Sequence, residues 1–225
     1  MFRQRLPQLS IWKEGSERKV DLLLSILMPN RFYGRPEMNV IAADRVAEPA
    51  SANGVEAIQF AVTGCDLGKV LVACSRIGVC AILLGTNAEE LEIELRKMSP
   101  DGVFIRNERA VEKDTCSILG FLSLPITGLD IALDIRGTPF QRKVWAALRT
   151  IPAGRPLTFT QLACRIPGSK SLRAIGQACA DNPIALAIPC HRVIGHSGSL
   201  SNYRYGASCK RSLLNREVLA ASPRR

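Results

Sequence analysis

The stretch Thr138-Pro139-Phe140-Gln141-Arg142-Lys143-Val144-Trp145-Ala146-Ala147-Leu148 decides how the second half of this chain folds. A threonine hydroxyl can accept a hydrogen bond from the first turn of a helix, and proline suits the first helical position because no partner awaits its missing N–H. Apolar residues recur at helical spacing, at Phe140, Val144, Trp145 and Leu148. The sequence therefore predicts a helix from Pro139 that Ile151-Pro152-Ala153-Gly154 brings to an end.

Two shorter helices are predicted downstream. The first covers residues 158–165 and the second residues 171–181, where Asn182-Pro183 stops it. The turn Ile166-Pro167-Gly168-Ser169 separates them, and the outline is that of a helix-turn-helix unit. The spacing on the second helix places Leu172, Ile175 and Cys179 on one face and Arg173, Gly176, Gln177 and Ala180 on the other. Taken alone, the segment fits a helix packed against a neighbour equally well.

The region upstream of Thr138 has a different pattern. Short apolar runs at residues 57–62, 69–74 and 79–85 are separated by glycine-containing turns, which predicts a meander of strands. Asn87 can then cap a helix that runs to Arg96, and its acidic first turn suits the helix dipole. We expect an α+β fold, with residues 1–55 as an irregular extension, residues 56–135 as an α+β domain and residues 136–220 as a helical domain.

Positive charge is concentrated in the helical part. The whole chain carries a formal net charge of +10, yet residues 136–225 hold 15 Lys and Arg against only Asp181 and Glu217, a net charge of +13. A region almost without carboxylates indicates a polyanionic partner, and nucleic acid fits better than an anionic membrane once the helix-turn-helix outline is considered.

Several classes of protein are disfavoured by the composition. No run approaches the ~20 apolar residues of a membrane-spanning helix, and no export signal is evident, so a cytoplasmic protein is expected. The eight cysteines form no CxxC or CxxH pair, which predicts reduced cysteines that serve as small core residues and no metal site.

The stretch Ala185-Leu186-Ala187-Ile188-Pro189-Cys190-His191-Arg192-Val193-Ile194 carries the candidate chemistry, because an apolar run delivers a thiol beside one of only two histidines. A thiol needs a base or a positive neighbour to become a nucleophilic thiolate. His191 can act as that base, and Glu217 is almost the only carboxylate nearby in sequence to orient it. Neighbouring residues of an extended segment point to opposite sides, so this relay requires a bend or a bridging water. A structural cysteine beside a histidine is the alternative.

These residues resemble a known family. Pro189-Cys190-His191-Arg192-Val193, with Asn182-Pro183 before it and Gly198-Ser199-Leu200-Ser201-Asn202-Tyr203-Arg204 after it, is similar to the O6-alkylguanine-DNA alkyltransferases, and especially to the repair half of bacterial adaptive-response proteins. The resemblance runs from residue 65 to residue 217. Arg31-Phe32-Tyr33-Gly34 more weakly resembles the end of an AraC-type DNA-binding domain, of which residues 1–55 would retain a remnant.

The resemblance implies a ribonuclease H-like N-terminal domain, a winged-helix-like DNA-binding domain and a role for each matching residue. Cys190 would accept the alkyl group, His191 would deprotonate it through a water, Glu217 would polarise His191, and Asn182 would brace the turn. Arg173 would fill the space left by a flipped nucleotide, while the DNA-facing set would be Gly176, Gln177, Ala180 and Lys210. The alkylguanine pocket would be lined by Tyr203, Phe159 and Cys179.

The implied reaction is a single, irreversible transfer of an alkyl group from O6-alkylguanine in double-stranded DNA, bound through the minor groove. It needs no cofactor, no catalytic metal and no small-molecule methyl donor. Three residues depart from the family pattern. Phe159 replaces a tyrosine whose hydroxyl serves the departing guanine, Gln177 is bulkier than usual, and Cys209 replaces a basic residue.

Two other functions are compatible with parts of the sequence. A non-catalytic binder that flags alkylated DNA would share Arg173 and the basic surface, but such binders lack the acceptor cysteine. A Cys-His-Glu hydrolase would need an oxyanion hole, and no glycine-rich elbow accompanies Cys190.

Overall fold

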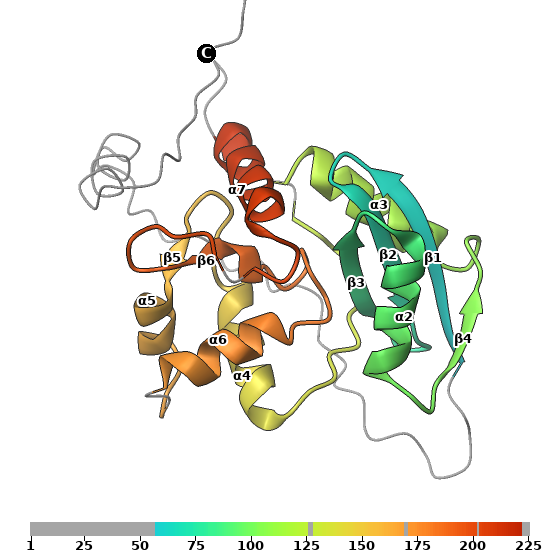
Figure 1. The fold of residues 1–225 in the computed structure, drawn as a ribbon, viewed down its shortest axis with the longest axis horizontal. Coiled ribbons are helices and arrows are strands. Elements are labelled where there is room, and N and C mark those ends of the chain that lie inside the picture. Colours follow the sequence, from blue (N-terminus) through green and yellow to red (C-terminus); the bar gives the residue numbers. More distant parts are fainter. Residues whose placement is uncertain (1–56, 126–127, 169–170, 202, 222–225) are drawn as a thin grey trace, which may run out of the picture.

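The computed structural model describes residues 57–125, 128–168, 171–201 and 203–221. The predicted extension at residues 1–55 lies outside this part, as do Ser169 of the predicted turn and Asn202 of the family motif. Figure 1 shows a sheet with its helices on one side of the molecule and a mainly helical region on the other. The expected α+β fold class is confirmed.

The sheet begins with the predicted meander. Strands β1 (Ala57–Cys65), β2 (Gly68–Cys74) and β3 (Val79–Gly85) pair antiparallel in sequence, and β4 (Val103–Arg106) then joins β1 in parallel to give the order β3-β2-β1-β4. Helix α2 (Ala88–Met98) connects β3 to β4, and the Asn87 side chain accepts a hydrogen bond from the Glu89 amide at 2.8 Å, as predicted. Strand β4 and helix α3 (Glu112–Ser123) were not predicted.

Both faces of the sheet are covered. Leu91 and Leu95 of α2 pack against one face in a small cluster with Phe60 and Leu83. The opposite face contributes to a larger cluster that includes α3 and continues through the helical region, from Val144 of α4 to Leu213 of α7. The larger core therefore contains residues from both sides of the predicted boundary at residue 135.

The helical region contains α4 (Pro139–Arg149), β5 (Leu157–Thr158), α5 (Phe159–Cys164), α6 (Leu172–Ala180), the 3-10 turn η1 (Cys190–Arg192), β6 (Val193–Ile194) and α7 (Ala207–Ala221). Thr138 caps α4 as predicted, and Gln141 returns a hydrogen bond to the Thr138 amide to complete a capping box. Val144, Trp145 and Leu148 are buried. On α6 Ile175 and Cys179 are buried, but Leu172 is 45% exposed, so its assignment to the inner face is wrong. Leu172 occupies the first position of the helix and lies on the accessible side, in the same groove as Arg173.

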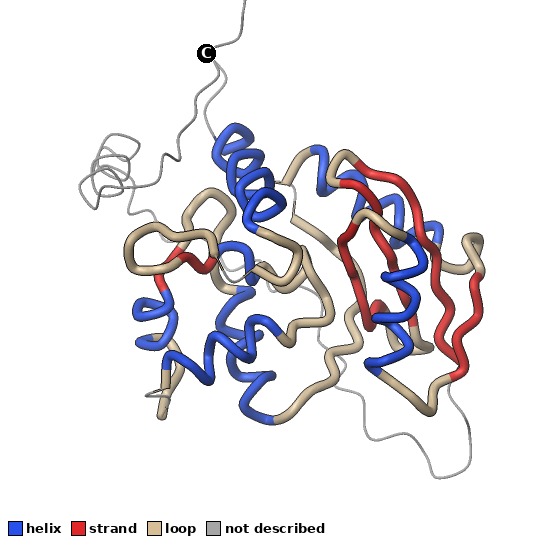
Figure 2. The backbone as a smooth tube through the Cα atoms, in the orientation of Figure 1, coloured by secondary structure: helices blue, strands red, loops and turns tan. Residues whose placement is uncertain are grey.

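The free edge of β3 joins the two parts of the molecule. Val79 donates to the carbonyl of Ala132, and Ile82 donates to the carbonyl of Pro183 and accepts from the amide of Ala185. The backbone just before the Cys190 segment is therefore hydrogen-bonded to a strand of the sheet. Figure 2 shows that most of the chain between α6 and α7 is loop. The hydrogen bonds to the edge of β3 therefore hold in place a segment that has little secondary structure of its own.

Two expectations from the composition concern membrane-spanning helices and cysteines. No helix within the described residues is long and apolar enough to cross a membrane. All eight cysteines are free, but only Cys179 and Cys190 are buried, while Cys116 and Cys164 are exposed. The half-buried Cys65, Cys74, Cys80 and Cys209 pack against the two hydrophobic clusters, so six of the eight cysteines contribute to the core, and the prediction that most cysteines are core residues is confirmed.

Candidate active site

The Cys190 thiol lies at the start of a tight turn. Pro189 precedes the 3-10 turn η1, in which Cys190 and His191 are buried at 8% and 0% exposure. The sequence required a bend or a water to bring these neighbours into one site, and the chain bends. Leu186, four residues earlier, adopts a positive φ of 71° while buried, an uncommon conformation for a leucine that tertiary contacts must stabilise.

Asn182 holds this turn from inside. Its Nδ2 donates to the Ile188 carbonyl at 2.8 Å and lies 3.2 Å from Cys190 Sγ, while its Oδ1 accepts from the Ile184 amide at 3.0 Å. Asn182 is 2% exposed. One side chain therefore fixes the backbone at two points before the turn and donates a hydrogen bond to the sulfur.

Glu217 reaches the site from α7 and binds three groups. One oxygen lies 2.8 Å from His191 Nε2 and 2.9 Å from Arg192 Nε, and the other accepts from the Gly154 amide at 3.0 Å. Burial alone would raise the pKa of Glu217, but the hydrogen bond from His191 and the charges of His191 and Arg192 lower it. Glu217 is therefore a carboxylate at neutral pH.

The tautomer of His191 follows from this contact. Burial lowers the pKa of His191 against the opposing effect of Glu217, so the ring is neutral at neutral pH. A neutral imidazole has one N–H, and Nε2 is the nitrogen that faces a carboxylate acceptor. We infer that Nε2 carries the proton. Nδ1, which is buried and has no hydrogen-bond partner among the described residues, is then the nitrogen able to accept one.

The Cys190 sulfur is a thiol in this resting arrangement. Burial raises its pKa, while the hydrogen bond from Asn182 and the charge of Lys210 act in the opposite direction. A buried thiol beside a neutral imidazole must lose its proton during the reaction to become a nucleophile. The site therefore contains a thiol, a proton acceptor and an anion that stabilises the protonated acceptor.

Lys210 does not lie on the DNA-facing surface, where the family resemblance placed it. It is 2% exposed, and its ammonium donates to the Val193 carbonyl. The ammonium nitrogen lies 5.7 Å from the centre of the Tyr203 ring. A buried ammonium cannot contact a phosphate. Burial lowers its pKa, and its charge acts on Cys190 and Cys179.

Tyr203 and Cys179 lie in the same interior. Tyr203 is 9% exposed and packs edge-on against Tyr205 with ring centres 5.5 Å apart. Burial, and then the nearby Cys190, raise the pKa of Tyr203 well above its usual value, so its hydroxyl stays protonated. Burial also raises the pKa of Cys179 to about 12, with Cys190 as the second cause.

The outer face of α6 forms a separate groove of about 530 Å³. Its lining includes Phe159 from α5 and Arg173, Gly176, Gln177 and Ala180 from α6. A methyl group built on Gly176 would meet only the Phe159 ring, at 4.0 Å, so space lies open above the helix. The predicted DNA-facing residues of α6 thus share one accessible surface, while Lys210 does not belong to it.

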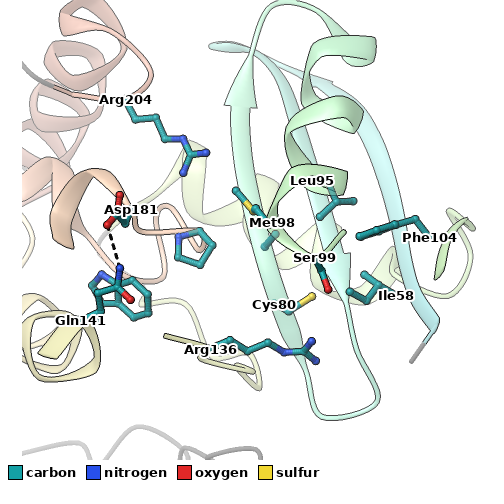
Figure 3. Close-up of a pocket in the computed structure, with 13 residues that line it drawn as sticks. Ile58, Cys80, Leu95, Met98, Ser99, Phe104, Arg136, Gln141, Asp181 and Arg204 are labelled. Atoms are coloured by element: carbon teal, nitrogen blue, oxygen red, sulfur yellow. Dashed lines mark hydrogen bonds between the residues drawn. The ribbon is translucent and has the colours of Figure 1, made fainter. Parts of the chain in front are cut away.

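Gln177 is restrained on that surface. Its Nε2 donates to Asp181 Oδ1 at 2.7 Å, and Gln141 of α4 donates to the other oxygen of Asp181 at 3.0 Å. Figure 3 shows the Gln141–Asp181 bond at the edge of a cleft of about 350 Å³ between the sheet and the helical region. The hydrogen bond to Asp181 therefore holds the Gln177 side chain along the helix axis, towards the C-terminal end of α6.

Two residues that contribute to the site were not identified from the sequence. Arg192 was quoted only as part of a motif, yet it is buried and bonded to Glu217 and to the Ile151 carbonyl. Asp181 was counted only as a charge. For Arg192 the scarcity of carboxylates in this region was the available signal, because a buried guanidinium there has almost no anion except Glu217 to pair with.

Comparisons with known proteins show which family the chain is similar to. Residues 139–219 match the family model described as 6-O-methylguanine DNA methyltransferase, DNA binding domain. The chain is 44% identical over 162 residues to the Escherichia coli bifunctional transcriptional activator/DNA repair enzyme Ada, covering 72% of this chain and 46% of that protein. The chain thus spans about half the length of the first relatives that it matches.

Other relatives are matched over most of their length. The methylated-DNA–protein-cysteine methyltransferase of Methanosarcina acetivorans is 32% identical over 70% of this chain and 97% of its own, and that of Kluyveromyces lactis is 36% identical over 66% and 85%. A Mycobacterium tuberculosis OGT solved in complex with DNA superposes with a TM-score of 0.61 at 30% identity, over 72% of this chain and 94% of that one. The chain belongs to the methylated-DNA–protein-cysteine methyltransferase family.

Proposed function

We propose that this protein repairs DNA by moving an alkyl group, such as methyl, from O6 of alkylated guanine onto the sulfur of Cys190. One observation carries the proposal: a buried thiol lies 3.2 Å from the Asn182 amide, in the same turn as a neutral histidine whose far nitrogen is bonded to a buried carboxylate. Such an arrangement generates a thiolate only where a substrate has entered and water has been excluded.

The transfer is a displacement at carbon. The Cys190 proton passes through a bridging water to Nδ1 of His191, and Glu217 stabilises the resulting imidazolium through Nε2. The thiolate attacks the alkyl carbon, a carbon–sulfur bond forms, and the carbon–O6 bond breaks with its electron pair leaving on guanine, which takes up one proton. A thioether is not readily hydrolysed, so each molecule acts once.

The DNA substrate approaches through the groove on α6. An O6 substituent inside a duplex cannot reach a buried sulfur, so the nucleotide must rotate out of the helix at a cost of roughly a few kcal/mol. Arg173, exposed on α6, is suited to occupy the vacated space, and the small residues Gly176 and Ala180 let the helix lie deep in the minor groove.

The decisive experiment uses a duplex with one O6-methylguanine whose methyl group is radiolabelled. Wild-type protein should acquire about one label per molecule and then stop, and Cys190→Ala should acquire none. Cys116→Ala is the matched control, because it removes an exposed thiol on α3, outside the site, and should still accept a full equivalent. Label on Cys190→Ala, or several equivalents on the wild type, would contradict the proposal.

A second function has one observation in its favour. Phe159 offers no hydroxyl to the departing guanine, which would suit a protein that binds alkylated DNA and transfers very slowly. In the same experiment this binder would retain the labelled duplex and leave the methyl group on guanine.

A further inference from the structure

Two residues that follow parallel strands meet at the groove on α6. Strand β5 pairs with β6 in parallel, with Thr158 opposite Ile194. Parallel strands end at the same edge, so Phe159, directly after β5, and His196, two residues after β6, emerge side by side. Both line the groove described above. Figure 1 shows β5 and β6 adjacent to each other between α5 and the segment that follows β6.

His196 differs from His191 in burial and in hydrogen bonding. His191 is wholly buried and bonded to Glu217, whereas His196 is exposed at the rim of the groove. Five residues, including the short strand β6, separate it from Cys190. The backbone that carries the nucleophile therefore also presents His196 to whatever occupies the groove.

The groove has the electrostatics of a site for a phosphodiester. Its described lining residues include one permanent cation, Arg173, one imidazole, His196, and no carboxylate. An exposed imidazole N–H is a good partner for phosphate oxygens, and it is less suited to a guanine that must reach the buried sulfur. Phe159 on the neighbouring wall is half-buried and brings no donor of its own.

We propose that His196 donates a hydrogen bond to the DNA backbone beside the flipped nucleotide, from a different segment of the groove lining than Arg173. This inference rests on the proposed function. It assigns the groove two polar anchors: Arg173 enters the base stack, and His196 holds the phosphate of the strand that carries the lesion. In this chain His196 supplies at the groove a hydrogen-bond donor that the Phe159 side chain lacks.

Binding is measured in a Cys190→Ser background, so that the lesion duplex is not consumed. His196→Ala should raise the Kd for an O6-methylguanine duplex about threefold to tenfold, the range expected for the loss of one ordinary hydrogen bond at an exposed site. His196→Lys should restore binding because it again offers an N–H donor. Lys97→Ala, which removes an exposed cation on α2, should leave the Kd unchanged.

A second measurement separates binding from chemistry and from folding. With Cys190 intact, His196→Ala should react with the free base O6-benzylguanine at the wild-type rate, because this substrate has no phosphate. Unchanged duplex binding in His196→Ala, no restoration by His196→Lys, or an equal loss of free-base reactivity would each overturn the inference. Failure of wild-type protein to accept label from duplex would instead overturn the proposed function, whatever His196 does to binding.

Discussion

The phenyl ring of Phe159 lies on the wall of the groove where the family pattern has a tyrosine. Phe159→Tyr should speed alkyl transfer by about tenfold or more, because one hydrogen bond to charge that develops on a leaving group stabilises a transition state by ~2 kcal/mol or more. Single-turnover transfer from a methylated duplex measures this. Phe104→Tyr adds a hydroxyl on β4, away from the site, and should change nothing. If Phe159→Tyr transfers no faster, the missing donor does not limit this protein.

Glu217 has a structural and a chemical role that can be separated. Glu217→Gln leaves Arg192 buried without its carboxylate, which should lower the free energy of unfolding by about 3 to 5 kcal/mol and slow transfer severely. The double variant Glu217→Gln/Arg192→Met removes both charges and should regain much of that stability, yet its transfer should stay slow because His191 still lacks its anion. Urea unfolding and single-turnover transfer give the two readouts. Recovery of both together would show that Glu217 acts only through stability.

Individual residues of the site were predictable to different degrees. Cys190, His191 and Glu217 could be connected from sequence because thiol, imidazole and carboxylate are all scarce in this region, and the structure brings them together. The burial of Lys210 could not be predicted. Its neighbour in sequence, Arg211, is exposed, and only the packing of α7 against η1 decides which of two adjacent cations points inwards.

Among the elements, those with strong local signals were predictable. Helix α4 has its threonine cap, its N-terminal proline and its apolar spacing, and all three appear in the structure. Strand β4 has no comparable signal, because Val103, Ile105 and Arg106 are exposed and pairing with β1 alone makes this segment a strand. Helix α3 begins without a side-chain cap, so its start is set by tertiary packing of Ile118 and Phe121.

The contribution of the α4 capping box to stability can be measured with two variants of Thr138. Thr138→Ala removes the hydroxyl that accepts from the Gln141 amide at 3.2 Å and should lower the free energy of unfolding by about 1 kcal/mol. Thr138→Ser keeps the acceptor and should stay close to wild type. Urea denaturation with an unchanged m-value measures the difference. Equal loss in both variants would mean that the threonine methyl group, and not the cap, stabilises the helix start.

For the molecule as a whole, stability should fall in acid. The folded-state pKa of His191 is lowered mainly by burial, so the stability gained by keeping it neutral is present above its unfolded pKa of about 6.5 and is lost as pH falls towards the lower folded value. Glu217 also has a lowered pKa in the folded protein, and its contribution is present above about 4.3 and lost at lower pH. Both effects have the same sign.

Urea unfolding at pH 7.5, 6.0 and 5.0 checks this expectation. The midpoint should decrease at each step, and His191→Gln should remove most of the decrease between the first two values, because glutamine does not titrate. A midpoint in the wild type that is constant from pH 7.5 to 5.0 would show that the His191–Glu217 pair does not govern acid stability.

Because Glu217 lies near the end of the described chain, the relay is completed late in protein synthesis. The chain leaves the ribosome from its N-terminus, so Cys190 and His191 emerge before α7 exists to supply their carboxylate. Until α7 docks, Arg192 and His191 lack the anion that allows them to be buried together. The reactive cysteine of a nascent chain is thus without its assembled relay, and a product truncated before residue 217 would carry the thiol without the means to activate it.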